Sequence, residues 1–126
     1  MKIIRFNHLK FIPASHEDKL DPGSWKKVLL QRHDLTVGQI QMINWAKLPV
    51  GKAFTDHFHQ DLQEVFIILS GTVKIIIDSE TNILNKGDTV VIPIHSHHQM
   101  ENISRTDVSY LAIGISNQGK GRTIVV

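Results

Sequence analysis

The sequence predicts an all-β fold, a sandwich or barrel built from short strands. Three observations lead to this class: many short runs rich in β-branched residues, turn signals between them, and no amphipathic stretch of ten residues that would form a helix. The 126 residues suit one domain, and the 41% of hydrophobic residues are enough to build its core. We therefore expect a single domain over residues 1–126.

In the first half of the chain, strands are expected over Lys2–Phe6, Trp25–Gln31 and Gly38–Lys47. Between the first two, Ser15–Leu20 is expected to form one helical turn with Ser15 as its cap. Asp21–Ser24 has the composition of a turn, and Leu48–Asp56 reads as a loop. This half therefore contributes three strands with irregular connections.

The second half shows the strand pattern more clearly. Glu64–Ser70 and Thr72–Asp78 are apolar, β-branched runs separated by Gly71, which predicts a hairpin or a tight corner. Thr89–Ile92 is a strand that ends at Pro93, because proline has no N–H to donate to a sheet. The remaining strands are expected over Asn82–Leu84, His97–Ile103, Asp107–Ile115 and Arg122–Val126, with a turn at residues 85–88.

Charge and composition limit the classes of function. Lys plus Arg is 14 and Asp plus Glu is 12, so the surplus of +2 gives no reason to expect a nucleic-acid partner. No apolar stretch is long enough for a signal peptide or a membrane span, so a cytoplasmic protein is expected. The chain has no cysteine, so a bound metal would need nitrogen and oxygen ligands. The basic residues Lys26, Lys27, Lys120 and Arg122 are expected to carry surface charge.

Histidine is the residue type that points to a site. The chain has eight, and two close pairs stand out, His57 with His59 and His97 with His98. Side chains two apart on a strand share a face, so His57 and His59 face one way and Phe58 faces the other. Two imidazoles placed in this way reach one metal ion at about 2.0–2.1 Å.

The same alternation places a carboxylate inside the fold. Glu64 shares a strand face with Phe66 and Ile68, so it is expected to point inward. A carboxylate among apolar side chains is costly unless it is paired or bound to a metal. In a separate strand, His98 shares a face with Met100 and Asn102, whereas His97 faces away.

The spacing of these residues is more specific than their composition. From Gly51 the chain reads glycine, five residues, His57, one residue, His59, four residues, Glu64, six residues, Gly71. From Gly87 it reads glycine, five residues, Pro93, one residue, His95, two residues, His98, three residues, Asn102. These two segments, residues 51–71 and 87–102, resemble the two signature motifs of the cupin family. The first matches at every fixed position, and the second departs once, where His95 stands in place of the family's usual glycine.

The resemblance implies a jelly-roll double-stranded β-helix, the cupin barrel. It also implies that the metal ligands are His57, His59, Glu64 and His98. The ion would be one divalent transition metal per chain, with Mn, Fe, Co, Ni, Cu and Zn all compatible with the ligand set. Three neutral imidazoles and one carboxylate leave such an ion with a charge of about +1 and with open positions for a substrate.

Three classes of function follow from such a site. The first is a small-molecule metalloenzyme, either dioxygenase-like or an isomerase of a sugar or keto acid, with His95 as a candidate catalytic residue at the cavity rim. The second is a binding module that holds a sugar or an organic acid without chemistry. The third, a purely structural protein, is disfavoured because it would keep Glu64 inside the barrel without a metal. Cupin folds host unrelated activities, so the fold does not name the substrate.

Other residues receive simpler expectations. His8, His16 and His33 lie in polar surroundings and are expected to be solvated. Residues expected either to line the cavity or to pack in the core are Met42, Phe54, Phe66, Ile68 and Met100. Exposed apolar strands tend to find partners, so Thr123–Val126 and Lys2–Ile4 are expected to serve as the edges of a homodimer.

Overall fold

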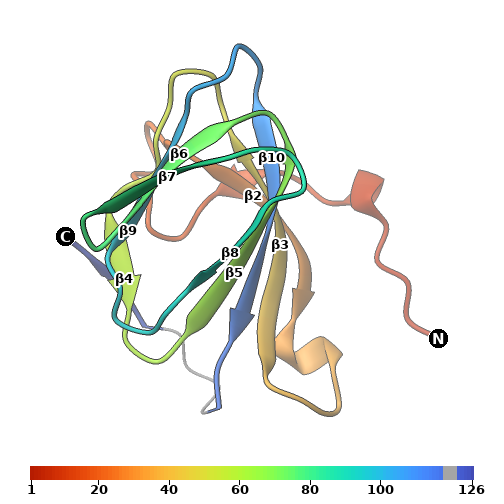
Figure 1. Ribbon diagram of the computed structural model, residues 1–126. Helices are drawn as coiled ribbons and strands as arrows, with labels where there is room; N and C mark the ends of the chain where they lie inside the picture. Colours follow the sequence, from red (N-terminus) through yellow and green to blue (C-terminus); the bar gives the residue numbers. More distant parts are fainter. Residues whose placement is uncertain (118–121) are drawn as a thin grey trace.

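Two antiparallel β-sheets make up the fold in the computed structural model, which describes residues 1–117 and 122–126 (Figure 1). The six-stranded sheet has the order β1 (Ile12–Pro13), β2 (Trp25–Gln31), β3 (Ile40–Leu48), β10 (Val108–Ile115), β5 (Gln63–Ser70), β8 (Thr89–Ile92). The five-stranded sheet has the order β11 (Thr123–Val125), β4 (His57–His59), β9 (His98–Asn102), β6 (Val73–Ile77), β7 (Glu80–Leu84). The expected all-β, jelly-roll class is confirmed.

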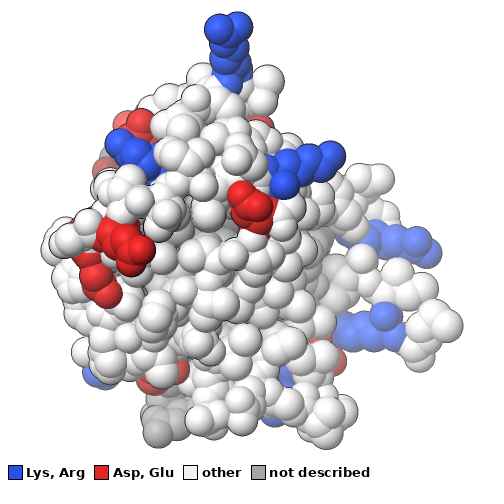
Figure 2. Space-filling view, in the orientation of Figure 1, with Lys and Arg blue, Asp and Glu red and all other residues white. Residues whose placement is uncertain are grey.

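Helical structure in the described residues consists of two short 3₁₀ turns, η1 (Phe6–His8) and η2 (Arg32–Asp34). None of the described helices has the length and apolar character needed to cross a bilayer. On the face seen in Figure 2, acidic and basic side chains are interspersed over a largely uncharged surface, which is consistent with the small net charge of +2.

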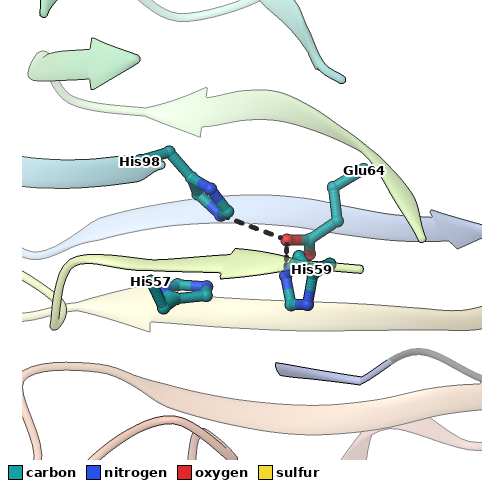
Figure 3. Close-up of side chains that lie close together, drawn as sticks. All are labelled: His57, His59, Glu64 and His98. Atoms are coloured by element: carbon teal, nitrogen blue, oxygen red, sulfur yellow. Dashed lines mark hydrogen bonds and ion pairs between the residues drawn. The ribbon is translucent and has the colours of Figure 1, made fainter. Parts of the chain in front are cut away.

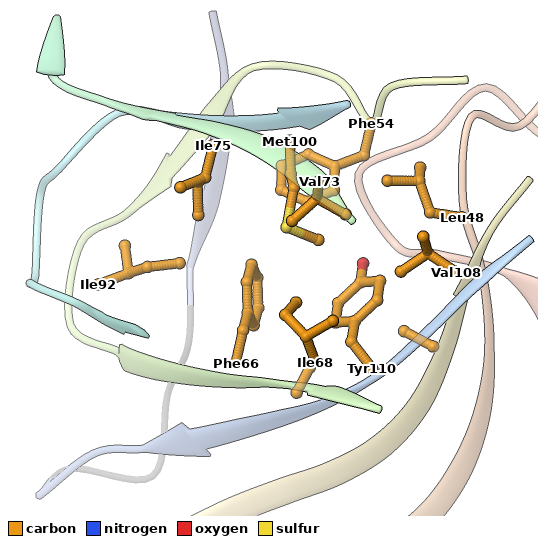
Figure 4. Packing of buried hydrophobic residues seen from close by; sticks show 12 residues of the cluster. Leu48, Phe54, Phe66, Ile68, Val73, Ile75, Ile92, Met100, Val108 and Tyr110 are labelled. Atoms are coloured by element: carbon orange, nitrogen blue, oxygen red, sulfur yellow. The ribbon is translucent and has the colours of Figure 1, made fainter. Parts of the chain in front are cut away.

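The core lies between the two sheets, where alternate side chains of each strand meet (Figure 4). Strand β10 alternates buried and partly buried residues along its whole length, and β5 and β9 follow the same two-residue period. The buried cluster consists of Ala46, Leu48, Phe54, Phe66, Ile68, Val73, Ile75, Ile92, Met100, Val108, Tyr110 and Ala112. Of the five residues expected in the cavity or the core, four belong to this cluster, and Met42 lines the cavity described below.

Gly71 forms the corner between the two sheets. Strand β5 belongs to the six-stranded sheet and β6 to the other, so the expected hairpin or corner is a corner. Gly71 has a φ of +80°, and a Cβ atom there would lie 2.6 Å from Val108 Cγ2 and 2.9 Å from Ser104 Oγ. Both the backbone angle and the crowding require glycine.

The N-terminal segment departs from the prediction. Lys2–Phe6 forms no strand, and β1 is the strand that lies beside β2. The segment is held by side chains instead: the Phe6 ring packs edge-on against Trp45 at 5.0 Å, and Lys27 Nζ lies 3.7 Å from the centre of the Phe6 ring. The strand predicted for Lys2–Phe6 is therefore wrong, whereas the homodimer stays a prediction.

The expected helical turn at Ser15–Leu20 is also absent. Residues 15–16 form a simple turn, in which Glu17 N donates to Ala14 O at 3.0 Å. The Ser15 hydroxyl accepts a hydrogen bond from Lys26 Nζ at 2.7 Å instead of capping a helix. The path of residues 15–20 is set instead by hydrogen bonds between Glu17 and backbone N–H groups farther along the chain, which are described below.

The C-terminal end of the described chain agrees better with expectation. Strand β11 is an edge of the five-stranded sheet and pairs only with β4 among the described strands. Ile124, Val125 and Val126 are exposed there, and the homodimer through this edge stays a prediction. Lys120, expected at the surface, lies outside the described residues.

Candidate metal centre

Three neighbouring segments bring four polar side chains to one point inside the fold (Figure 3). His57 and His59 come from β4, Glu64 from β5 and His98 from β9, where His98 pairs across strands with His57. All four are buried, and one potential ligand atom from each lies within 4.8 Å of the others. The predicted inward faces of β4, β5 and β9 are therefore confirmed, and the four expected ligands form one cluster.

Each histidine of this cluster is held from outside through its Nδ1 atom. His57 Nδ1 lies 2.6 Å from Thr55 O, and His98 Nδ1 lies 3.0 Å from Ser96 O. A carbonyl oxygen only accepts, so both Nδ1 atoms carry a proton, and in the neutral form of each ring the lone pair is on Nε2. His59 Nδ1 lies 3.1 Å from the Thr123 hydroxyl, which accepts or donates and so suits either tautomer. Such outer contacts orient histidines that bind metals.

The environment of His98 tests whether a cation fits this cluster. His98 Nε2 is buried without a hydrogen-bond partner, and it faces Glu64 Oε1 at 3.3 Å. With its proton on Nδ1, this nitrogen directs a lone pair at a carboxylate oxygen, and two electron-rich atoms repel unless a positive charge lies between them. On the other side, His59 Nε2 is 2.5 Å from the same oxygen. A donor set of nitrogen and oxygen with one unsatisfied buried atom fits a transition metal ion.

The protonation states also favour metal binding. Burial, and then the charges of His16 and His98, lower the pKa of His57 to about 3, so its imidazole is neutral near pH 7. Burial raises the pKa of Glu64, but the interactions with the neighbouring His59 and His98 rings outweigh it and hold that pKa well below its usual range. A neutral imidazole, as at His57, and an ionised carboxylate, as at Glu64, are the forms that bind a metal.

A cavity of about 240 Å³ adjoins the cluster. His59 and Glu64 form part of its wall, and Phe66, Leu62 and Met42 supply apolar surface. This volume is below the roughly 300–1,000 Å³ of pockets for drug-sized ligands, so it suits a small molecule. A larger open hollow of about 900 Å³ lies over β6, β7 and β8, but none of the four clustered residues lines it.

His16 belongs to this site, contrary to the expectation that it is solvated. Its ring stacks on His57 with centroids 4.0 Å apart and planes inclined by 20°, and its side chain lines the cavity. His8 and His33 are exposed, as expected. No spacing in the sequence indicates the position of His16, because it lies in a turn far from both motifs.

Glu17 fixes the segment that carries His16. Its carboxylate accepts hydrogen bonds from Gly23 N at 2.7 Å and Thr55 N at 2.8 Å, and it lies 2.8 Å from His16 Nδ1. Burial raises the pKa of Glu17, but the bonds from His16 and Thr55 outweigh it and lower that pKa to about 2. One carboxylate thus ties residues 14–24 to the loop before β4.

Lys26 and Lys27 are not simple surface charges. Lys27 is 9% exposed, and its ammonium donates to Phe6 O at 3.2 Å. Lys26 is partly buried and lines the same cavity as Glu64. Burial lowers the pKa of Lys26, while the charge of Glu64 acts in the opposite direction. The expectation of surface charge is wrong for both, because β2 lacks the alternation that would have shown which face is buried.

The other two histidines of the second motif, His95 and His97, lie apart from the cavity. His97 points outward and stacks on Phe58 with centroids 4.7 Å apart, as the alternation predicted. His95 is exposed and lines a surface hollow beside Gln60 and Asp61. Its φ of +69° is a left-handed value, so the position favours the glycine that the family usually has there. A catalytic role for His95 stays a prediction.

Comparison with known proteins agrees with this geometry. Residues 44–114 match the model of the cupin domain family. The chain is 32% identical over 111 residues to the uncharacterised protein MJ1618 of Methanocaldococcus jannaschii, and the match covers 88% of this chain and 85% of that protein.

Solved structures share the fold at low sequence identity. A predicted oxalate decarboxylase from Thermotoga maritima superposes with a TM-score of 0.74 and 21% identity, covering 91% of this chain and 99% of the other. A cupin-superfamily sugar phosphate isomerase from Silicibacter pomeroyi also gives 0.74, with 16% identity over 99% of this chain and 82% of the other. At such identities the likeness concerns the fold, and the activities named belong to those proteins.

Proposed function

The chain belongs to the cupin family, and on that premise we propose that it is a metal-dependent enzyme acting on a small molecule. The proposed ligands of its single divalent metal are His57, His59, Glu64 and His98. The observation that carries the proposal is the convergence of four buried donor atoms within 4.8 Å beside a cavity. Glu64 would have no reason to stay ionised among buried side chains without a cation or a charged partner.

The bound ion would supply Lewis-acid polarisation of a chelated substrate or a place for dioxygen. The residues of the chain would do the rest. His57 and His98 are fixed by the carbonyls of Thr55 and Ser96, so their Nε2 atoms stay aimed at the cluster. Phe66 and Leu62 keep part of the cavity wall apolar, which excludes water from a bound substrate.

Oxygenation of a chelated acid and isomerisation of a sugar or keto acid are the two reactions that we propose for this site. The isomerisation is supported by the fold shared with a sugar phosphate isomerase. Both reactions are supported by the charge of about +1 that one Glu leaves on a divalent ion. The alternative is a module that binds a sugar or an organic acid without reaction. Turnover separates the classes: in an enzyme, Glu64→Ala abolishes conversion while the fold persists, whereas a binding module consumes no substrate.

The decisive experiment is elemental analysis of the purified, untagged protein beside two variants. His98→Ala removes a proposed ligand, and His97→Ala is its matched control, because His97 is the adjacent residue and stacks outside on Phe58. We expect about one divalent ion per chain in the native protein and in His97→Ala, and little in His98→Ala. A redox-active ion would direct the search to oxygen consumption, and zinc to isomerisation or binding.

Two results would contradict the proposal. The first is a native protein that holds no metal after reconstitution with any of the six candidate ions. The second is a His98→Ala variant that retains metal as well as the His97→Ala control does. Circular dichroism of each variant shows whether the fold is intact, so loss of metal is distinguished from loss of structure.

A further inference from the structure

Lys26 places a positive charge in the cavity wall, where Glu64 acts on it only from a distance and no carboxylate of the described residues forms an ion pair with it. Across the strands it pairs with Ala46, which also lines the cavity, so the Lys26 side chain faces inward. Its ammonium donates a hydrogen bond to the neutral Ser15 hydroxyl at 2.7 Å, and no described carboxylate lies within 4.0 Å of it. A partly buried ammonium in such a position is suited to an anion supplied from outside.

The acidic residues near the cavity are already engaged. Glu64 faces His59 and His98, and Glu17 is bonded to His16 and to backbone N–H groups. A divalent ion with one carboxylate keeps a charge of about +1, which one chelating carboxylate of a ligand would balance. The charge on Lys26 is then left for a second anionic group of the same ligand.

The approach to the cavity has the same sign. An outer groove of about 670 Å³ shares Lys26, Gln41, Met42 and Asn44 with the cavity wall. Its other lining residues include Arg32 and His33, and none of its described lining residues is acidic. Asp34, close to His33, is already paired with Lys2. A basic entrance raises the local concentration of anions and speeds their association.

A buried acceptor lies in the wall common to the groove and the cavity. Asn44 is 8% exposed, its Nδ2 lies 3.5 Å from Met42 Sδ, and its Oδ1 has no hydrogen-bond partner. Buried carbonyl oxygens are normally bonded, so this atom is an expected partner for a hydroxyl group of a ligand. The wall therefore offers a cation and an acceptor next to the metal ligands.

We propose that Lys26 determines specificity by selecting a small hydroxy acid that carries a second carboxylate, which it binds through its ammonium group. This inference rests on the proposed function, because the other end of the ligand would chelate the metal. Neutral sugars of similar size would leave Lys26 unpaired and are disfavoured as ligands.

The test compares two ligands that differ only at the distal end. Malate carries two carboxylates, and its amide analogue keeps the chelating hydroxy acid but has a neutral distal carboxamide. Affinity for each is measured by calorimetry with the metal-loaded native protein, Lys26→Met and Lys74→Met. Lys74 lies in β6, partly exposed and 3.9 Å from Glu101, so its replacement changes the net charge equally without touching the cavity.

We expect the native protein to prefer malate by about tenfold to a hundredfold, the effect of one charge-assisted hydrogen bond. Lys26→Met should lose this preference while its affinity for the amide and its metal content stay unchanged. Lys74→Met should behave as the native protein does. Three results overturn this inference but leave the proposed function standing. They are equal affinity of the native protein for both ligands, no binding of either ligand, and an equal loss of affinity for both ligands in Lys26→Met. A native protein without metal overturns the proposed function, and this inference with it.

Discussion

Replacement of Glu17 by glutamine tests whether one carboxylate holds the segment over the candidate metal centre. The glutamate side chain is 3% exposed and is bonded to Gly23 N, Thr55 N and His16. Glutamine keeps the shape but has one accepting oxygen and one NH₂ group, so at least one buried donor loses its partner. An unsatisfied buried donor costs about 1–3 kcal/mol, and the remaining bonds lose their charge assistance. We expect Glu17→Gln to lower the free energy of unfolding by about 3 kcal/mol.

The effect has a defined dependence on pH. The pKa of Glu17 falls from 4.5 to about 2 on folding, so the unfolded chain takes up the proton first as the pH is lowered. The contribution of Glu17 is therefore complete above pH 4.5 and is lost as the pH falls toward 2. The difference in stability between native protein and Glu17→Gln should be constant near neutrality and should shrink through that window.

Urea unfolding followed by tryptophan fluorescence measures this difference, with metal removed by a chelator so that binding adds no stability. Glu80→Gln is the control, because Glu80 is exposed in β7 and its loss should change stability by less than about 0.5 kcal/mol. The reasoning is refuted if Glu17→Gln unfolds at the same urea concentration as the control. It is equally refuted if the gap stays constant between pH 4.5 and 2.

Two further predictions concern backbone positions. In urea unfolding, Gly71→Ala should destabilise the protein by about 1–3 kcal/mol more than Gly87→Ala. The two glycines have similar φ values (+80° and +88°), but only a Cβ atom at position 71 would crowd Val108. Equal effects of the two substitutions would show that the corner relaxes freely. His95→Gly should be more stable than His95→Ala by about 1 kcal/mol, because alanine keeps the strained φ of +69° and glycine relieves it. Equal melting temperatures of the two His95 variants would argue against strain at that position.

The cluster was predictable from the sequence because strand alternation and local spacing carry it. His57 and His59 lie on one face at i and i+2, and Glu64 shares its face with Phe66, so periodicity alone orients all three. His98 required the second motif, because its strand lies far along the chain. Strand pairing then brought it opposite His57, as the resemblance to cupins implied.

The rest of the cavity was not predictable in this way. His16 lies in a turn whose path depends on the hydrogen bonds of Glu17 to residues 6 and 38 positions away. Lys26 lies on a strand without hydrophobic alternation, and the register between β2 and β3 shifts between Val28 and Leu30. Lys2–Phe6 has the composition of a strand but pairs with none of the described strands, and β-propensity depends on such context. Each of these features depends on contacts between residues far apart in the sequence, which no local sequence pattern encodes.

The hydrogen bond between His59 and Thr123 has a consequence for the order of assembly. The two residues are 64 positions apart, and Thr123 belongs to β11, the last of the described strands. Closing a loop of that length is slow compared with local structure formation. A chain in which β11 has not yet docked lacks the outer contact of His59, so we expect the cluster to be complete only once β11 has docked. Metal acquisition by this protein would then report complete folding, and a chain stalled before that stage would remain unloaded.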